Sequence, residues 1–123
     1  MRVTNESNVV PHDALLDTAV DVARRLRVLD EYGSVARATG ALRRRRPGFE
    51  PSDYARALTS ALELLDRARV LAEENRPELQ RRGQLSVSDR QQHARELERH
   101  HPGFPPATYD WLIGWVIYYL VLR

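Results

Sequence analysis

The chain has 123 residues, of which 42% are hydrophobic and 29% are charged, and its formal net charge is only +2. This composition is typical of a single globular domain rather than of a disordered or polybasic chain. Cysteine is absent, which excludes disulfides, thiol catalysis and thiolate metal sites.

Residues 1–10 are mostly polar and lack the basic start and apolar stretch of a signal peptide, so we interpret them as a flexible lead-in and expect a cytoplasmic protein. Pro11 suits the first position of a helix. Apolar residues then recur at steps of three and four, which predicts a first amphipathic helix. They are Leu15, Ala19, Val22, Leu26 and Leu29, and Gly33 is a plausible stop.

Four more helices are predicted, separated by proline and glycine. Ser34 can cap a short second helix that ends at Pro47, and Pro51 begins a long third helix that ends near Asn75. Residues 76–87 read as a connection of about twelve residues. Ser88 begins a polar fourth helix. The fifth helix starts at Pro106 and extends toward the C-terminus.

The junctions before the third and fifth helices repeat one pattern. Residues 42–54 and residues 97–109 share a leucine, a Pro-Gly-Phe turn, a proline and a tyrosine in the same register. The sequence therefore predicts an all-α protein, namely a five-helix bundle in which residues 11–123 form one domain. Two αα-hairpins, 34–75 and 88–123, would form a pseudo-twofold repeat around an apolar C-terminal helix.

That C-terminal helix is apolar on every side, so we expect it to be enclosed by the rest of the chain or by a second copy. It is shorter than the roughly 20 apolar residues that a membrane span needs. Few polar side chains are placed so that they could meet in one active site, so we predict a non-catalytic protein without cofactor or metal. It would be an adaptor, regulatory or immunity-type protein that acts through protein–protein contacts, and we favour a homo-oligomer. The candidate contact residues are Trp111, Trp115, Tyr118 and Tyr119.

A run of four arginines offers a second interpretation. Arg43, Arg44, Arg45 and Arg46 could bind the phosphates of a nucleic acid. The same residues could equally favour the helix dipole and pair with neighbouring acids. The second copy of the pattern has Glu98, Arg99, His100 and His101 at these positions, so the charge is not part of the repeated pattern.

The fourth helix carries two further patterns. His93, Glu96 and His100 share a face, and Glu98 and His101 have the spacing of half a dimetal site, but a complete site needs further carboxylates that the fifth helix does not supply. Arg95 and His100 resemble the R-x4-6-H motif of HEPN-type ribonucleases. The resemblance covers these two residues. It implies an enzyme in which Arg95 holds a phosphate and His100 acts as acid or base across a dimer interface.

Overall fold

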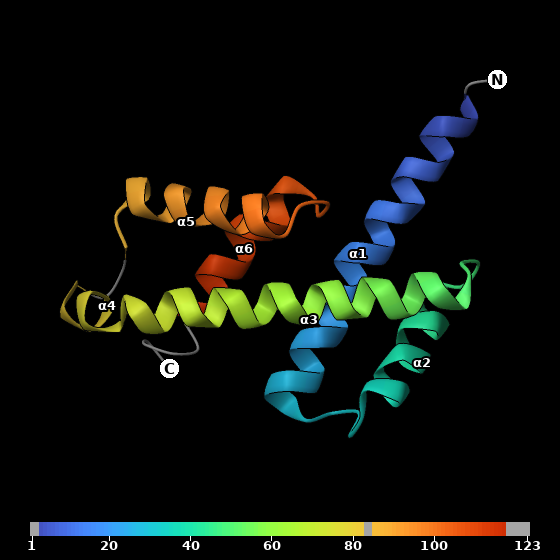
Figure 1. The fold of residues 1–123 in the computed structure, drawn as a ribbon, viewed down its shortest axis with the longest axis horizontal. Coiled ribbons are helices and arrows are strands. Elements are labelled where there is room, and N and C mark those ends of the chain that lie inside the picture. Colours follow the sequence, from blue (N-terminus) through green and yellow to red (C-terminus); the bar gives the residue numbers. More distant parts are fainter. Residues whose placement is uncertain (1–2, 83–84, 118–123) are drawn as a thin grey trace. The chain divides into compact units, whose positions relative to one another are not determined.

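The structure, a computed structural model, describes residues 3–82 and 85–117, and within these ranges it contains six α-helices and no strand (Figure 1). The predicted all-α class is confirmed. No helix in the described ranges is long and apolar enough to cross a membrane. The helices are α1 (Val3–Leu29), α2 (Val35–Arg45), α3 (Pro51–Glu74), α4 (Arg76–Arg82), α5 (Val87–His100) and α6 (Pro106–Ile117).

The chain forms two compact units, residues 1–62 and residues 63–123, and α3 contributes to both. The first unit contains α1, α2 and the beginning of α3. The second contains the end of α3 together with α4, α5 and α6. Each unit thus includes one tight corner between two helices, namely α2 and the start of α3 in the first unit and α5 and α6 in the second.

The first unit buries the apolar face that the sequence predicted for α1. Leu15, Ala19 and Val22 are inaccessible to solvent, whereas Leu29 is exposed at the helix end. The helix begins at Val3 and not at Pro11, as the sequence had suggested. Pro11 therefore lies inside the helix, where it has no backbone N–H to donate to the preceding turn. The flexibility expected of residues 1–10 stays a prediction.

A tyrosine hydroxyl closes the corner between α2 and α3. The Tyr54 hydroxyl donates to the carbonyl of Arg46 over 2.6 Å and accepts from the backbone N–H of Phe49 over 3.1 Å. The Phe49 ring meets the Tyr54 ring edge-on, with 5.9 Å between centroids. Gly48, directly before Phe49, has φ of 105°, a conformation that residues with a Cβ rarely adopt.

The corner between α5 and α6 has the same local structure. The Tyr109 hydroxyl donates to the carbonyl of His101 over 2.6 Å and accepts from the N–H of Phe104 over 3.2 Å. The two rings meet edge-on at 6.1 Å, and Gly103 has φ of 110°. The helix before each corner also ends alike, because the N–H of the capping residue donates to the carbonyl of a fully buried leucine. The repeated letters therefore encode one hydrogen-bonded turn, used twice.

The predicted count of five helices is wrong for the described residues, because the segment expected to be a connection contains α4. Pro77 is the second residue of α4, within the first turn, where the missing N–H would have had no helical partner. Leu79 is fully buried and anchors this helix, and Glu78 pairs with Arg81 and Arg82. Pro77 therefore follows the end of α3 at Glu74 and lies in the first turn of α4.

Two serines cap the helices that precede the corners. The Ser34 hydroxyl accepts from the N–H of Arg37, which confirms the predicted cap of α2. The cap of α5 is Ser86, whose hydroxyl accepts from the N–H of Asp89, and not Ser88 as the sequence suggested. Helix α5 therefore starts at Val87.

Candidate functional site

The candidate contact surface lies on α6 and consists of Trp111 and Trp115. The indole rings are nearly parallel, with an interplanar angle of 13° and 6.2 Å between ring centroids. Trp111 is 46% exposed, and Trp115 is partly buried. We call these two stacked side chains the indole face. The other candidates, Tyr118 and Tyr119, lie outside the described residues.

The opposite side of α6 belongs to the core of the second unit. Leu112, Ile113 and Val116 are buried, together with Tyr109 at the start of the helix. Within one chain, α6 is therefore enclosed on one side only, and the side that carries Trp111 is not covered by the described residues. The predicted enclosure by a second copy stays a prediction. A sequence that is apolar on every face cannot indicate which face turns to solvent.

An ion pair beside the indole face joins α5 to α6. The guanidinium of Arg90 donates to a carboxylate oxygen of Asp110 over 3.1 Å and to the Asp110 carbonyl over 3.2 Å. Gly114 leaves room for this contact, because a Cβ at that position would lie 2.6 Å from one Arg90 nitrogen. The glycine thus allows Arg90 to lie flat across the helix that presents the two indoles.

Other exposed apolar side chains are aliphatic. Large hydrophobic residues that are exposed in the described part of the chain are Leu29, Val35, Val70, Val87 and Trp111. Single exposed aliphatic residues are ordinary on protein surfaces. A half-exposed tryptophan stacked on a second one is less ordinary, because an indole buries a large area when a partner covers it.

The four consecutive arginines divide into two pairs. Arg45 pairs with the carboxylate of Asp21 on α1 over 2.8 Å, and the Nε of Arg46 donates to the buried hydroxyl of Thr18 over 2.9 Å. Arg43 and Arg44 are exposed, and neither forms an ion pair with a described residue. Arg45 and Arg46 therefore hold α2 against α1, whereas Arg43 and Arg44 are available to bind a ligand.

Asp21 is the centre of this contact. Its carboxylate also accepts from Arg24 and Arg25, over 2.9 Å and 3.0 Å. Burial alone would raise the pKa of Asp21, but the hydrogen bonds from the three arginines outweigh burial and hold the pKa well below its usual range. Asp21 was not among the predicted site residues, although the spacing from Asp21 to Arg24 and Arg25 is that of helical ion pairs.

The residues that resemble a ribonuclease motif lie on the surface of α5. Arg95 and His100 are both exposed, and five residues of helix place their side chains about 140° apart around the axis. Neither takes part in a hydrogen bond or ion pair with the described residues. Their role in catalysis stays a prediction, as does any role of a symmetry-related partner.

The histidines of α5 also do not share one environment. His93 is partly buried, whereas His100 is exposed, so the shared face that helical spacing suggested is not equally accessible. Within the described ranges, no three side chains of metal-ligating type come close enough to hold an ion.

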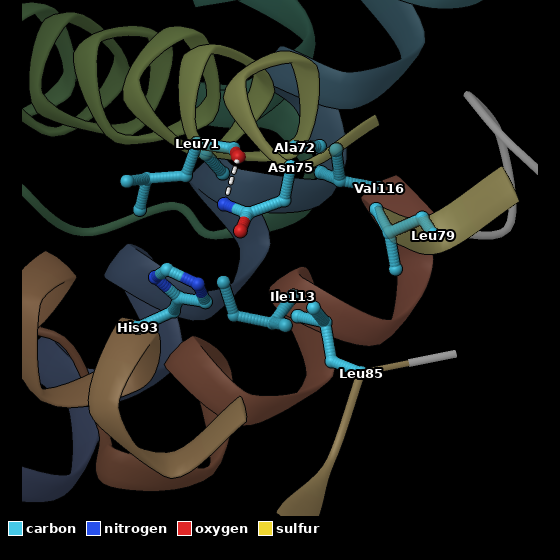
Figure 2. Close-up of a pocket in the computed structure, with 9 residues that line it drawn as sticks. Leu71, Ala72, Asn75, Leu79, Leu85, His93, Ile113 and Val116 are labelled. Carbon is cyan, nitrogen blue, oxygen red and sulfur yellow. Dashed lines mark hydrogen bonds between the residues drawn. The ribbon is translucent and has the colours of Figure 1, made fainter. Parts of the chain in front are cut away.

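Figure 2 shows that His93 faces a small cavity in the second unit. The cavity has a volume of about 10 Å³ and is lined by Ala68, Leu71, Ala72, Asn75, Leu79, Leu85, His93, Ile113 and Val116. The Asn75 amide donates to the carbonyl of Leu71 over 2.8 Å, and the buried Nδ1 of His93 has no protein partner among the described residues. Such a volume suits about one water molecule and is far below that of a small-molecule pocket. The cavity therefore does not form a substrate site.

Comparison with known proteins identifies no relative: no protein-family model, curated protein or solved structure matches the chain at a significant level. A function must therefore be inferred from the geometry of the indole face and of the arginines on α2.

Proposed function

We propose that the chain is a small non-catalytic interaction protein, of the adaptor, regulatory or immunity type, that acts through protein–protein contacts. The proposal assigns it no catalytic residue, cofactor or metal. The contact surface is the indole face, and its occupant is the same face on a second copy of the chain, related by a twofold axis. The observation that carries the proposal is the 46% exposure of Trp111 on a helix whose other side is buried.

The arrangement of the indole face suits a contact. Tryptophan is enriched among residues that dominate binding energies, because a rigid indole buries a large area at low cost in side-chain entropy. Trp115 stacks on Trp111, and Arg90 with Asp110 fixes the helix beneath them. A face that is preformed in this way loses less conformational freedom when it binds.

The exposed area predicts weak association. Covering the exposed part of one Trp111 removes roughly 100 Å² from water, worth about 2.5 kcal/mol, and a twofold contact gains that amount twice. Ordering two molecules costs at least about 4 kcal/mol, so the indoles need the surrounding surface to reach a dissociation constant between about 1 µM and 1 mM. Self-association should therefore depend on concentration in a measurable range.

We also propose that the fold arose by duplication of an αα-hairpin, which gave residues 34–75 and residues 88–123. The support is the agreement of the two corners in hydrogen bonds, ring packing and glycine conformation. The charged residues before the two corners differ, so the repeat is a structural device and not a repeated binding site.

Sedimentation velocity tests the contact role. The wild-type chain should shift from monomer to dimer as its concentration rises from about 1 µM to about 1 mM. Trp111→Ser should remain monomeric over the same range. Val70→Ser is the matched control, because Val70 is 44% exposed on α3 of the same unit and its loss should leave the dimer intact. A wild-type chain that stays monomeric throughout, or a control as impaired as Trp111→Ser, would contradict the proposal.

A further inference from the structure

Helix α2 carries an unusual concentration of uncompensated positive charge. Residues 34–49 contain five arginines and no acidic residue. Arg45 and Arg46 are bound to α1, as described above, but Arg37, Arg43 and Arg44 are exposed and pair with no acidic side chain among the described residues. We call these three residues the α2 arginine face.

The three guanidinium groups lie on adjoining sides of one helix. Arg37 and Arg44 are seven residues apart, which places them on the same side of the helix and about 10 Å apart along its axis. Gly40 lies between them, and one Arg44 nitrogen lies 3.6 Å from the point that a Cβ would occupy on Gly40. The Arg44 side chain therefore runs back over the glycine toward Arg37. Arg43 extends the charge around the helix by about 100°.

The remaining contacts of α2 keep this face in position. Arg45 pairs with Asp21, Arg46 donates to Thr18, and the carbonyl of Arg46 accepts the Tyr54 hydroxyl. The helix is thus attached to α1 on one side and to the corner at its end. The exposed arginines do not have to change partners within the protein in order to bind a ligand.

We propose that the α2 arginine face binds the phosphate groups of double-stranded nucleic acid without reading its sequence. A guanidinium presents two parallel N–H donors that match a phosphate, and it keeps its charge at all physiological pH values. An acidic protein partner fits less well, because protein interfaces have an apolar core and the exposed part of α2 offers only Val35. Helix α2 also contains no aromatic residue on which an unpaired base could stack, which favours a duplex over a single strand.

The number of arginines predicts how binding depends on salt. Three phosphate contacts give a slope of log K against log salt of about −2.7 for duplex DNA. Affinity should therefore fall about 40-fold between 50 mM and 200 mM salt. The net charge of +2 means that attraction depends on this local face rather than on the whole molecule.

Fluorescence anisotropy with short labelled DNA and RNA duplexes tests the proposal on the full chain. The triple variant Arg37→Gln, Arg43→Gln, Arg44→Gln should lose at least about tenfold in affinity at 50 mM salt and most of the salt dependence. The control variant Arg69→Gln, Arg81→Gln, Arg99→Gln removes the same charge from exposed positions of the second unit. It should bind as the wild type does. The single variant Arg44→Gln should lose about one third of the slope, and circular dichroism checks that each variant is folded.

Several results would overturn the proposal. These are no duplex binding by the wild type at 50 mM salt, equal affinities of the two triple variants, or tighter binding of a single strand. Binding of poly-glutamate through the same arginines, without duplex binding, would instead assign the face to an acidic protein. Binding of DNA alone or of RNA alone identifies which duplex supplies the phosphates and supports the assignment in either case. Because the indole face is not altered, these results are independent of the self-association test.

Discussion

Removing one hydroxyl group from the second corner tests whether the tyrosine closes it. Tyr109→Phe keeps the ring and its edge-on contact with Phe104 but deletes both hydrogen bonds of the hydroxyl. The N–H of Phe104 is then left in a buried environment without its acceptor, and the carbonyl of His101 loses a 2.6 Å donor. The substitution thus changes hydrogen bonding with almost no change in packing volume.

The expected loss follows from burial. An unsatisfied buried backbone group costs about 1–3 kcal/mol, so we expect Tyr109→Phe to lower the free energy of unfolding by about 2 kcal/mol. Tyr54→Phe removes the equivalent bonds from the first corner, but there the bonded groups are only partly buried and water can replace the hydroxyl. We expect about 1 kcal/mol in that case.

Urea unfolding, followed by tryptophan fluorescence, measures the effect in the second unit, because Trp111 and Trp115 are the two tryptophans of the chain. A loss of 2 kcal/mol should lower the midpoint by about 1 M urea. Far-UV circular dichroism follows the first unit for Tyr54→Phe. Tyr32→Phe is the control, since Tyr32 has no hydrogen bond through its hydroxyl in the described structure. A change below about 0.5 kcal/mol for Tyr109→Phe would refute the reasoning.

The alkaline limb of the stability profile gives a second measurement. Burial raises the pKa of Tyr109, and the negative charge of nearby Glu98 raises it further. The hydrogen bond from the backbone of Phe104 lowers this pKa, but the net shift is upward. A raised pKa in the folded state means that the unfolded chain loses this proton first, so stability falls as pH rises above about 10. Tyr109→Phe should lack that part of the loss. An alkaline profile identical to that of the wild type would show that the hydroxyl is not held protonated by folding.

Three further predictions concern the contacts between helices. Asp21→Asn should lower the free energy of unfolding by about 2 kcal/mol at pH 7 in urea titrations. It should also flatten the acid limb, because the carboxylate stabilises the fold above its unfolded pKa near 3.9 and loses that effect as pH falls toward the lower folded value; an unchanged acid limb would contradict this. Gly114→Ala should leave the stability of the wild type nearly unchanged, because the gain in helix propensity offsets the cost of displacing Arg90 from Asp110. In the Arg90→Ala background the same substitution should stabilise the fold by about 1 kcal/mol. The double-mutant cycle should therefore show coupling of about 0.5–1 kcal/mol, and additive effects would refute the contact. Gly103→Ala and Gly48→Ala should each cost about 1–2 kcal/mol in thermal or urea unfolding through backbone strain alone, because no atom lies within 4 Å of either new Cβ; neutral variants would contradict the positive φ.

The corners could be predicted from the sequence because their chemistry is local. Proline and glycine end one helix, a second proline begins the next, and Pro51 and Pro106 begin α3 and α6 as expected. The two hydrogen bonds of each tyrosine hydroxyl depend on how the chain folds back over five to eight residues. The spacing alone therefore indicated a corner but not the bonds that close it.

Features that depend on neighbouring helices could not be predicted. The division of the arginine run, with Arg45 and Arg46 bound to α1 and Arg43 and Arg44 exposed, requires the position of Asp21 and Thr18. The sequence of α6 is apolar throughout, so it also does not indicate that the side with Trp111 faces solvent. Helix α4 was missed because a proline reads as the end of a helix, although it is also favourable in the first turn of a new one.

Acrylamide quenching of tryptophan fluorescence tests the contact role most directly, because both fluorophores belong to the indole face. If a second copy covers this face, the quenching constant should fall as the protein concentration rises through its dissociation constant. In the Trp111→Ser chain, which should remain monomeric, the quenching constant of Trp115 should not change with protein concentration. Quenching that is the same in dilute and concentrated wild-type protein would show that the indoles stay exposed and would contradict the proposed contact.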